Sequence, residues 1–215
     1  RYILAALCLA GAAFFLLPKR DSRDRSSIKG EKVRVFEKNV MLLFIACTLM
    51  WTSNTMYLIA MPQYVTHILR YSSELSGFMM GTAAFLEMPV MLVTGKFARR
   101  LGIRTFMILA ASGGVLFYVT MLFVTSPFLL LAAQFFNAVY IGILAGIGMV
   151  YFQELLPSVP GEATTLFSNS AAVGGMAAGV TAGSIAALYG FDYVFTADLL
   201  LAAAAFVMLF FVRKV

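Results

Sequence analysis

The sequence has few of the residues from which enzymes build catalytic and metal sites. Among 215 residues there are two cysteines and one histidine. No spacing typical of a nucleophile–base pair, a phosphate-binding glycine loop or a His/Cys metal cluster occurs. The sequence therefore predicts a protein that is not an enzyme and that holds no cofactor or metal. Cys8 and Cys47 both fall in long apolar segments, so we expect small buried thiols rather than a disulfide framework.

Charge is missing from seven long hydrophobic runs, in which Glu87 and Asp198 are the only formally charged residues. Hydrophobic residues make up 61% of the chain, above the roughly 45–50% of soluble domains. A helix needs about 20 apolar residues to cross the hydrocarbon core of a bilayer, and every run except the first reaches that length. The sequence thus predicts an all-α protein with seven transmembrane helices, surrounded by the lipid bilayer. The runs are 2–17, 40–61, 76–95, 105–124, 128–150, 163–188 and 193–212.

The basic residues that remain are distributed unevenly between the loops. If the loops alternate across a bilayer, 14 of the 16 Lys and Arg residues face one side, and only Arg1 and Arg70 face the other. Such a bias marks the cytoplasmic side of membrane proteins. The carboxyl terminus is therefore predicted to be cytoplasmic, and membrane topology accounts for the net charge of +6 without a nucleic-acid partner.

Residues 18–39 separate the first run from the other six. They carry both signs of charge and few apolar residues, so they are predicted to form a solvated cytoplasmic loop. One span, a charged loop and six further spans match the second half of a twelve-span carrier with the last helix of the first half attached. We therefore expect a fragment, with 1–17 as a truncated last helix of the N-terminal half and 40–215 as the six-helix C-terminal half. A signal peptide at 1–17 and a seven-helix receptor are the alternatives.

Glycines recur at close spacing in two of the runs. Small residues four apart allow helices to approach closely in lipid, so these runs are predicted to line tight helix contacts. Plain packing and helices that slide during transport are both open as explanations. The residues are Gly142, Gly146 and Gly148 in one run and Gly174, Gly175, Gly179 and Gly183 in the next.

Glu87 is the sharpest single signal in the sequence. A carboxylate in the middle of a span costs about 2.5–3.5 kcal/mol on insertion scales, so it should face the bundle interior or a water-filled cavity. Its helical neighbours, including Ala83 and Val90, offer no partner. Glu87 is therefore a candidate for proton coupling or substrate binding, and a structural hydrogen bond between helices is the alternative.

Two polar groups of residues lie within other spans. Trp51 and Asn54 are three apart and share a helix face, with Tyr57 following, while Asn137 lies between Gln134 and Tyr140 at the same spacing. An aromatic plate beside an amide suits a sugar, whose ring has an apolar C–H face and hydroxyls that donate and accept. Hydrogen bonding between helices is the alternative.

Other polar residues are expected to have smaller roles. Asp198 is only about six residues into the last run, close enough to the interface to be solvated, and a structural role is favoured. Asn169 lies near the cytoplasmic end of its helix, where water reaches it. His67 is expected to be exposed in an outer loop.

The segment GKFARRLGIR at 95–104, between two spans, resembles the loop motif of the major facilitator superfamily. Arg99 stands where that motif usually has an acidic residue. A more specific resemblance, over 42–170, is to the bacterial sugar efflux transporter family. It is carried by LMWTSNTMYLIAMP (49–62), GFMMGTAAFLEMPVML (77–92), FNAVYIGILAGIGMVYFQELLP (136–157) and GEATTLFSNS (161–170). The loop motif residues are Gly95, Ala98, Arg99, Arg100, Gly102 and Arg104.

The resemblance implies a twelve-helix carrier of the bacterial inner membrane that exports small sugars or glycosides, in exchange for protons, by alternating access. It places Trp51, Asn54, Tyr57, Glu87 and Asn137 on the substrate path, and it carries no role to Asp198. The site would lie between two halves, so the N-terminal half of the carrier is an expected partner. A multidrug exporter of the same superfamily is the alternative function.

Overall fold

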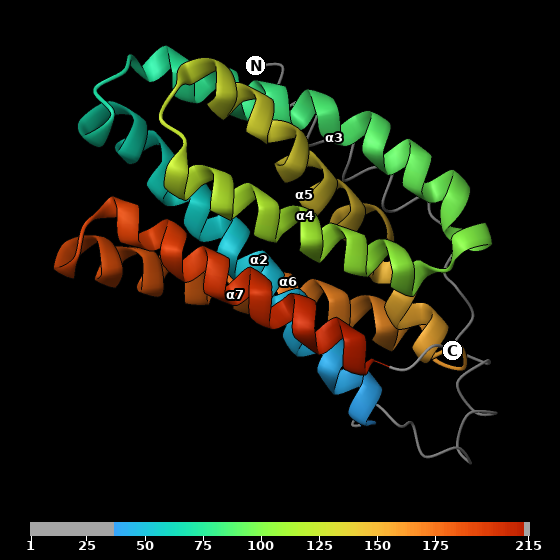
Figure 1. The fold of residues 1–215 in the computed structure, drawn as a ribbon. Coiled ribbons are helices and arrows are strands. Elements are labelled where there is room, and N and C mark those ends of the chain that lie inside the picture. Colours follow the sequence, from blue (N-terminus) through green and yellow to red (C-terminus); the bar gives the residue numbers. More distant parts are fainter. Residues whose placement is uncertain (1–36, 213–215) are drawn as a thin grey trace, which may run out of the picture. The chain divides into compact units, whose positions relative to one another are not determined.

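The computed structural model describes residues 37–212, with the side chain of Arg99 left out. These residues form six long helices, and the first of them continues into a single turn of π-helix (Figure 1). The predicted span 2–17, nearly all of the loop 18–39, and Arg213 and Lys214 lie outside the described residues. The elements are α2 (Lys38–Gln63), η2 (Tyr64–Ile68), α3 (Ser73–Leu101), α4 (Ile103–Phe123), α5 (Pro127–Leu155), α6 (Pro160–Leu188) and α7 (Phe191–Phe211).

All six helices are long and apolar enough to cross a membrane. Their ends follow local sequence signals: Pro127 and Pro160 begin α5 and α6, where a missing backbone N–H costs nothing. Gly102 and Gly190 precede α4 and α7 with φ of 87° and 108°, a conformation that glycine adopts freely. The all-helical prediction is confirmed for the described residues, whereas the count of seven spans stays a prediction.

The connections are shorter than the hydrophobic pattern predicts. The expected loop 96–104 is reduced to Gly102, because α3 continues to Leu101 and α4 begins at Ile103. The expected loop 62–75 is helical as far as Ile68, so His67 is exposed, as predicted, but lies in η2. The hydrophobic run marks only the apolar part of each helix, while backbone hydrogen bonding continues the helix beyond it.

The helices pack as two groups of three. Helix α5 packs against α3 and α4, while α2 packs against α6 and α7. Contacts between α4 and α7 join the groups, and α5 also contacts α6 (Figure 1). Helices α3 and α6 are the least covered, with 17% of their most apolar stretch buried, compared with 33–56% in the other four.

The glycine runs meet the helix contacts only in part. A methyl group at Gly142 would lie 3.0 Å from a Val90 methyl and 3.3 Å from the Glu87 carbonyl oxygen, so α3 approaches α5 closely there. Gly174 plays the same role between α6 and α2. At Gly175, Gly179 and Gly183 an added methyl group would meet nothing within 4 Å, so the described helices do not make the predicted contact there. The spacing of glycines alone does not show which side of a helix faces a neighbouring helix.

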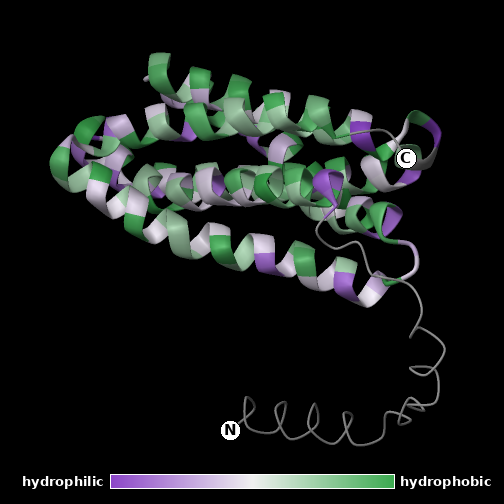
Figure 2. Ribbon diagram, turned by 90° about the horizontal axis from the view of Figure 1, so that it is seen from below, coloured by the Kyte–Doolittle hydropathy of each residue, from purple (hydrophilic) through white to green (hydrophobic). Residues whose placement is uncertain are grey.

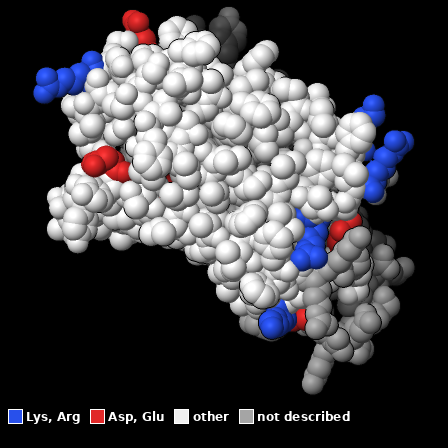
Figure 3. Space-filling model, in the orientation of Figure 1, with Lys and Arg blue, Asp and Glu red and all other residues white. Residues whose placement is uncertain are grey.

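Charged side chains gather at the two ends of the helices, and the surface between them is almost free of charge (Figure 3). Hydrophilic segments of the ribbon likewise gather near helix ends and connections, and a few interrupt the helices between them (Figure 2). Arg104 Nη2 donates to the Phe210 carbonyl oxygen at 2.6 Å, which ties the start of α4 to the end of α7. This arrangement is that of a multi-pass membrane protein.

Candidate substrate site

Trp51 and Asn54 lie on α2 on the side that includes the exposed Leu58, as their spacing predicts. Trp51 is half-buried: its ring meets Phe167 of α6 edge-on, with 6.2 Å between centroids, and its Nε1 has no hydrogen-bond partner. The Asn54 side chain is 8% exposed and forms no hydrogen bond to another described residue. The polar groups of both side chains thus have no hydrogen-bond partner in the described chain.

Tyr57 lies deeper in the bundle than Trp51 and Asn54. It is 1% exposed, and its ring packs edge-on against Phe117 of α4, with 4.9 Å between centroids. Because successive residues of a helix are rotated by about 100°, Tyr57 lies about 120° around the axis of α2 from Trp51. Tyr57 therefore lies on a different side of α2 from Trp51.

Gln134 on α5 connects two of the predicted residues. Its side-chain oxygen accepts hydrogen bonds from the Tyr57 hydroxyl at 3.3 Å and from Asn137 Nδ2 at 3.1 Å. Its amide nitrogen donates to the Leu130 carbonyl at 3.2 Å. Gln134 is fully buried, and these hydrogen bonds fix the orientation of its side chain. The sequence offered this residue in the Gln134–Asn137–Tyr140 row, but gave no sign of its central position.

Asn137 is held with one group unpaired. The side chain is 3% exposed and its nitrogen is bonded to Gln134, but its Oδ1 is buried without a partner. An unpaired buried acceptor is costly, and such groups are common where a ligand completes the hydrogen bonding. One turn further on, the Tyr140 hydroxyl bonds Ser53 Oγ at 2.7 Å and donates to the Met50 carbonyl, so this part of the row joins α5 to α2.

Glu87 lies on α3 at the edge of the face that packs on α5. Ser76, Met79, Ala83 and Thr94 of that face are buried, whereas Glu87 is half-buried with no partner among the described residues. The cross-helix partner expected for Glu87 is therefore not present in this part of the chain. Glu87 borders Gly142 of α5 but is not joined to Trp51 or Asn54.

The loop motif sits at helix ends. Gly95 and Ala98 are helical, and Ala98 is buried with its carbonyl accepting the Gly102 N–H at 2.9 Å. Arg100 is exposed, Arg104 bonds α7 as described above, and the side chain of Arg99 lies outside the described part.

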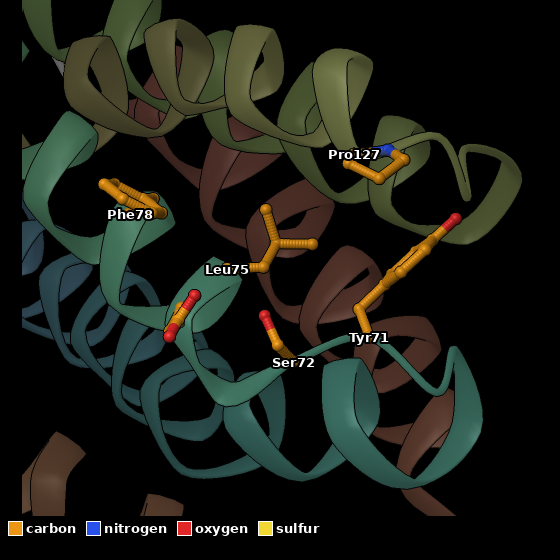
Figure 4. A pocket seen from close by; sticks show the side chains of 6 residues that line it. Tyr71, Ser72, Leu75, Phe78 and Pro127 are labelled. Carbon is orange, nitrogen blue, oxygen red and sulfur yellow. The ribbon is translucent and has the colours of Figure 1, made fainter.

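Two hollows lined by described residues lie away from the predicted site residues. One, of about 260 Å³, opens beside the link between η2 and α3, where Tyr71, Phe78 and Pro127 surround it (Figure 4). Another, of about 280 Å³, is an apolar groove between α3, α4 and α5 that includes Val90 and Phe135. No predicted site residue lines either of these two hollows.

Six helices of membrane-spanning length, with amides and tyrosines buried between them, indicate a polytopic membrane protein. The family model described as Major Facilitator Superfamily matches residues 2–158 and 43–215. The chain belongs to the major facilitator superfamily, and the predicted resemblance is confirmed.

Three relatives agree with this assignment. Sugar efflux transporter A of Escherichia coli is 47% identical over 83% of this chain and 45% of its own length. Sugar efflux transporter A of Dickeya chrysanthemi is 43% identical over 100% of this chain and 56% of its own length. Sugar efflux transporter B of Salmonella typhimurium is 46% identical over 85% of this chain and 46% of its own length. The chain thus spans about half the length of the curated relatives it matches. No solved structure matches it.

Proposed function

We propose that this chain is the C-terminal half of a carrier that exports small sugars or glycosides across the bacterial inner membrane by alternating access. The support is the 43–47% identity to proteins named sugar efflux transporters, together with the polar side chains held between α2 and α5. Binding at the midplane between two halves that rock against each other is the general scheme for such carriers.

The unpaired Oδ1 of Asn137 is the observation that carries the choice of substrate. Gln134 holds the Asn137 nitrogen, so the free oxygen is left to accept a hydrogen bond from a substrate hydroxyl. Asn54 supplies a second unpaired amide, and Trp51 an aromatic face for the sugar ring. Tyr57 contributes by holding Gln134 in place. Neutral amides suit a neutral polyhydroxyl solute better than a cation.

Glu87 is the proposed site of the coupling proton. It is an acid within a membrane span, half-buried and without a partner among the described residues. A group that is alternately neutral and charged must be reachable from water in some state, and the half-buried position of Glu87 at the edge of α3 meets that condition.

The proposed N-terminal half packs on the uncovered sides of α3 and α6. These helices carry glycines with open space around them, including Gly77 and Gly81 on α3 and Gly179 and Gly183 on α6. Close backbone contact at such small residues is what holds helices together in lipid. The end with Lys96, Arg100 and Arg104 is proposed to face the cytoplasm, which puts the C-terminus there.

A multidrug carrier is the alternative function, because Glu87 is unpaired and Met88 and Met91 beside it are exposed. Counterflow in proteoliposomes of the intact carrier separates the two. Vesicles preloaded with a galactoside should accumulate labelled galactoside transiently, and vesicles preloaded with a lipophilic cation should not accumulate labelled cation. Cation counterflow without sugar counterflow contradicts the sugar proposal.

A further inference from the structure

Asp198 of α7 is buried where the sequence predicted solvation. Its side chain is 0% exposed, and neither carboxyl oxygen has a hydrogen-bond partner. It lies about 10 Å along the axis from the start of α7, given a rise of 1.5 Å per residue. The prediction from depth was wrong because Asp198 faces the other helices, and depth along a helix does not tell which side a residue faces.

The surroundings of Asp198 contain hydroxyl groups rather than cations. Tyr118 of α4 and Tyr140 of α5 lie within electrostatic range of its carboxyl group, and the Tyr118 hydroxyl is itself buried without a partner. Around these tyrosines α2 contributes Tyr57 and Cys47. Helix α6, which also packs on α7, has its single ionisable residue, Glu162, in its first turn. No Lys, Arg or His of the described chain pairs with Asp198.

An aromatic layer separates Asp198 from the end of the bundle at η2. Phe195, three residues before Asp198, is 1% exposed, and its ring meets Tyr64 edge-on with 4.9 Å between centroids. Tyr57 packs between Phe195 and Phe117 in the same layer. Water from that end reaches Asp198 only if these rings separate.

We propose that Asp198 is a proton-binding site inside the bundle, separate from Glu87. An ionised carboxylate that is enclosed without a paired cation and without a hydrogen bond is strongly disfavoured. The carboxyl group therefore holds a proton while α2, α4, α5 and α7 enclose it, and releases the proton to water when the aromatic layer opens. A proton bound in one conformation and released in another couples the protonation of Asp198 to the movement of α7.

Infrared spectroscopy of the intact carrier in lipid tests this site directly. At neutral pH the wild type should show a carboxylic acid C=O band that is lost in Asp198→Asn and kept in Asp192→Asn, a matched change at the exposed start of the same helix. Phe195→Ala should speed the deuterium shift of this band several-fold. No loss of band intensity in Asp198→Asn, or a wild type without such a band, overturns the proposal.

Carbon-13 labelling of aspartate carboxyl groups keeps the test valid if Asp198→Asn does not fold. The label shifts aspartic acid bands and leaves glutamic acid bands in place, so the wild type alone reveals whether an aspartate is protonated at neutral pH. An unshifted band belongs to a glutamic acid such as Glu87, and the absence of any band that the label shifts contradicts the proposal. Since no sugar enters the measurement, failure of the sugar proposal leaves its result intact.

Discussion

At the scale of single residues, the described chain leaves a small number of polar groups unsatisfied inside an otherwise apolar bundle. Asn137 Oδ1, Trp51 Nε1 and both oxygens of Asp198 have no partner, although most buried polar groups in proteins are paired. These three residues lie on α2, α5 and α7, and further unpaired buried atoms include Ser76 Oγ on α3 and the Tyr118 hydroxyl on α4. Glu87 differs from them because it lies at the edge of its helix contact.

Glu87→Gln should separate sugar binding from proton coupling. The amide keeps the shape of the side chain but has no proton to exchange, so sugar counterflow should persist while uphill efflux driven by a proton gradient is lost. Glu74→Gln, at the exposed first turn of α3, is the control and should behave as wild type. Wild-type uphill efflux with unchanged pH dependence in Glu87→Gln contradicts the assigned role.

Tyr57→Phe should destabilise the protein modestly by removing one of the two donors to Gln134 while leaving the ring contact with Phe117. A hydrogen bond of this kind contributes about 0.5–1.5 kcal/mol, which thermal unfolding in detergent detects as a lower melting temperature. Tyr151→Phe is the matched control, since its hydroxyl is buried without a partner and its loss should cost nothing. Equal effects of the two changes on the melting temperature would contradict a stabilising hydrogen bond from Tyr57 to Gln134.

At the scale of elements, the sequence predicts which segments are helices far better than how the helices face one another. The hydrophobic runs locate all six described spans, because length and composition decide insertion in lipid. They misplace the helix ends, as at Gly102, because backbone hydrogen bonding continues past the hydrocarbon edge. They also misjudge Asp198, whose orientation depends on neighbours that no local pattern encodes.

Substitutions of two adjacent glycines on α6 test how this helix packs against α2. Gly174→Ala would bring a methyl group to 2.8 Å from Trp51 Cβ and 2.9 Å from the Thr48 carbonyl oxygen, so α6 must move away from α2. Overpacking of this kind costs about 1–3 kcal/mol. Gly175→Ala meets nothing within 4 Å and should be neutral in thermal unfolding. The reverse order of stabilities contradicts the described register of α6 on α2.

At the scale of the whole molecule, the described helices form one half of the proposed carrier, with α3 and α6 as its uncovered side. Apolar residues such as Phe78, Phe85 and Leu92 are 65%, 69% and 76% exposed on α3, and exposure to lipid alone would account for them. The open glycines do not follow from lipid exposure, and they favour a second protein surface against this side.

Gly179→Leu in the intact carrier should block transport without unfolding this half. The leucine fills the open space of α6 that the other half is proposed to occupy, while no described contact is disturbed. Ala204→Leu, at an exposed position of α7, adds the same bulk away from that side and should transport normally. Normal transport by Gly179→Leu contradicts the proposed position of the N-terminal half.

The sequence names most of the candidate site, because polar residues are rare enough in membrane spans to stand out individually. Trp51, Asn54 and Asn137 could be singled out in this way, whereas the part played by Gln134 depends on two hydrogen bonds from different helices. The opposite wall of the site belongs to the proposed other half, so neither the pattern nor the described helices define the whole cavity.

Equilibrium binding of a labelled galactoside to the purified intact carrier tests the central claim most directly. Loss of one hydrogen bond to a sugar hydroxyl, worth about 0.5–1.5 kcal/mol, should raise the Kd of Asn137→Ala by roughly 2- to 12-fold. Asn169→Ala, an amide exposed on α6, should bind as tightly as wild type. Saturable sugar binding that Asn137→Ala leaves unchanged, or no saturable binding by wild type, would contradict a sugar site built on α2 and α5.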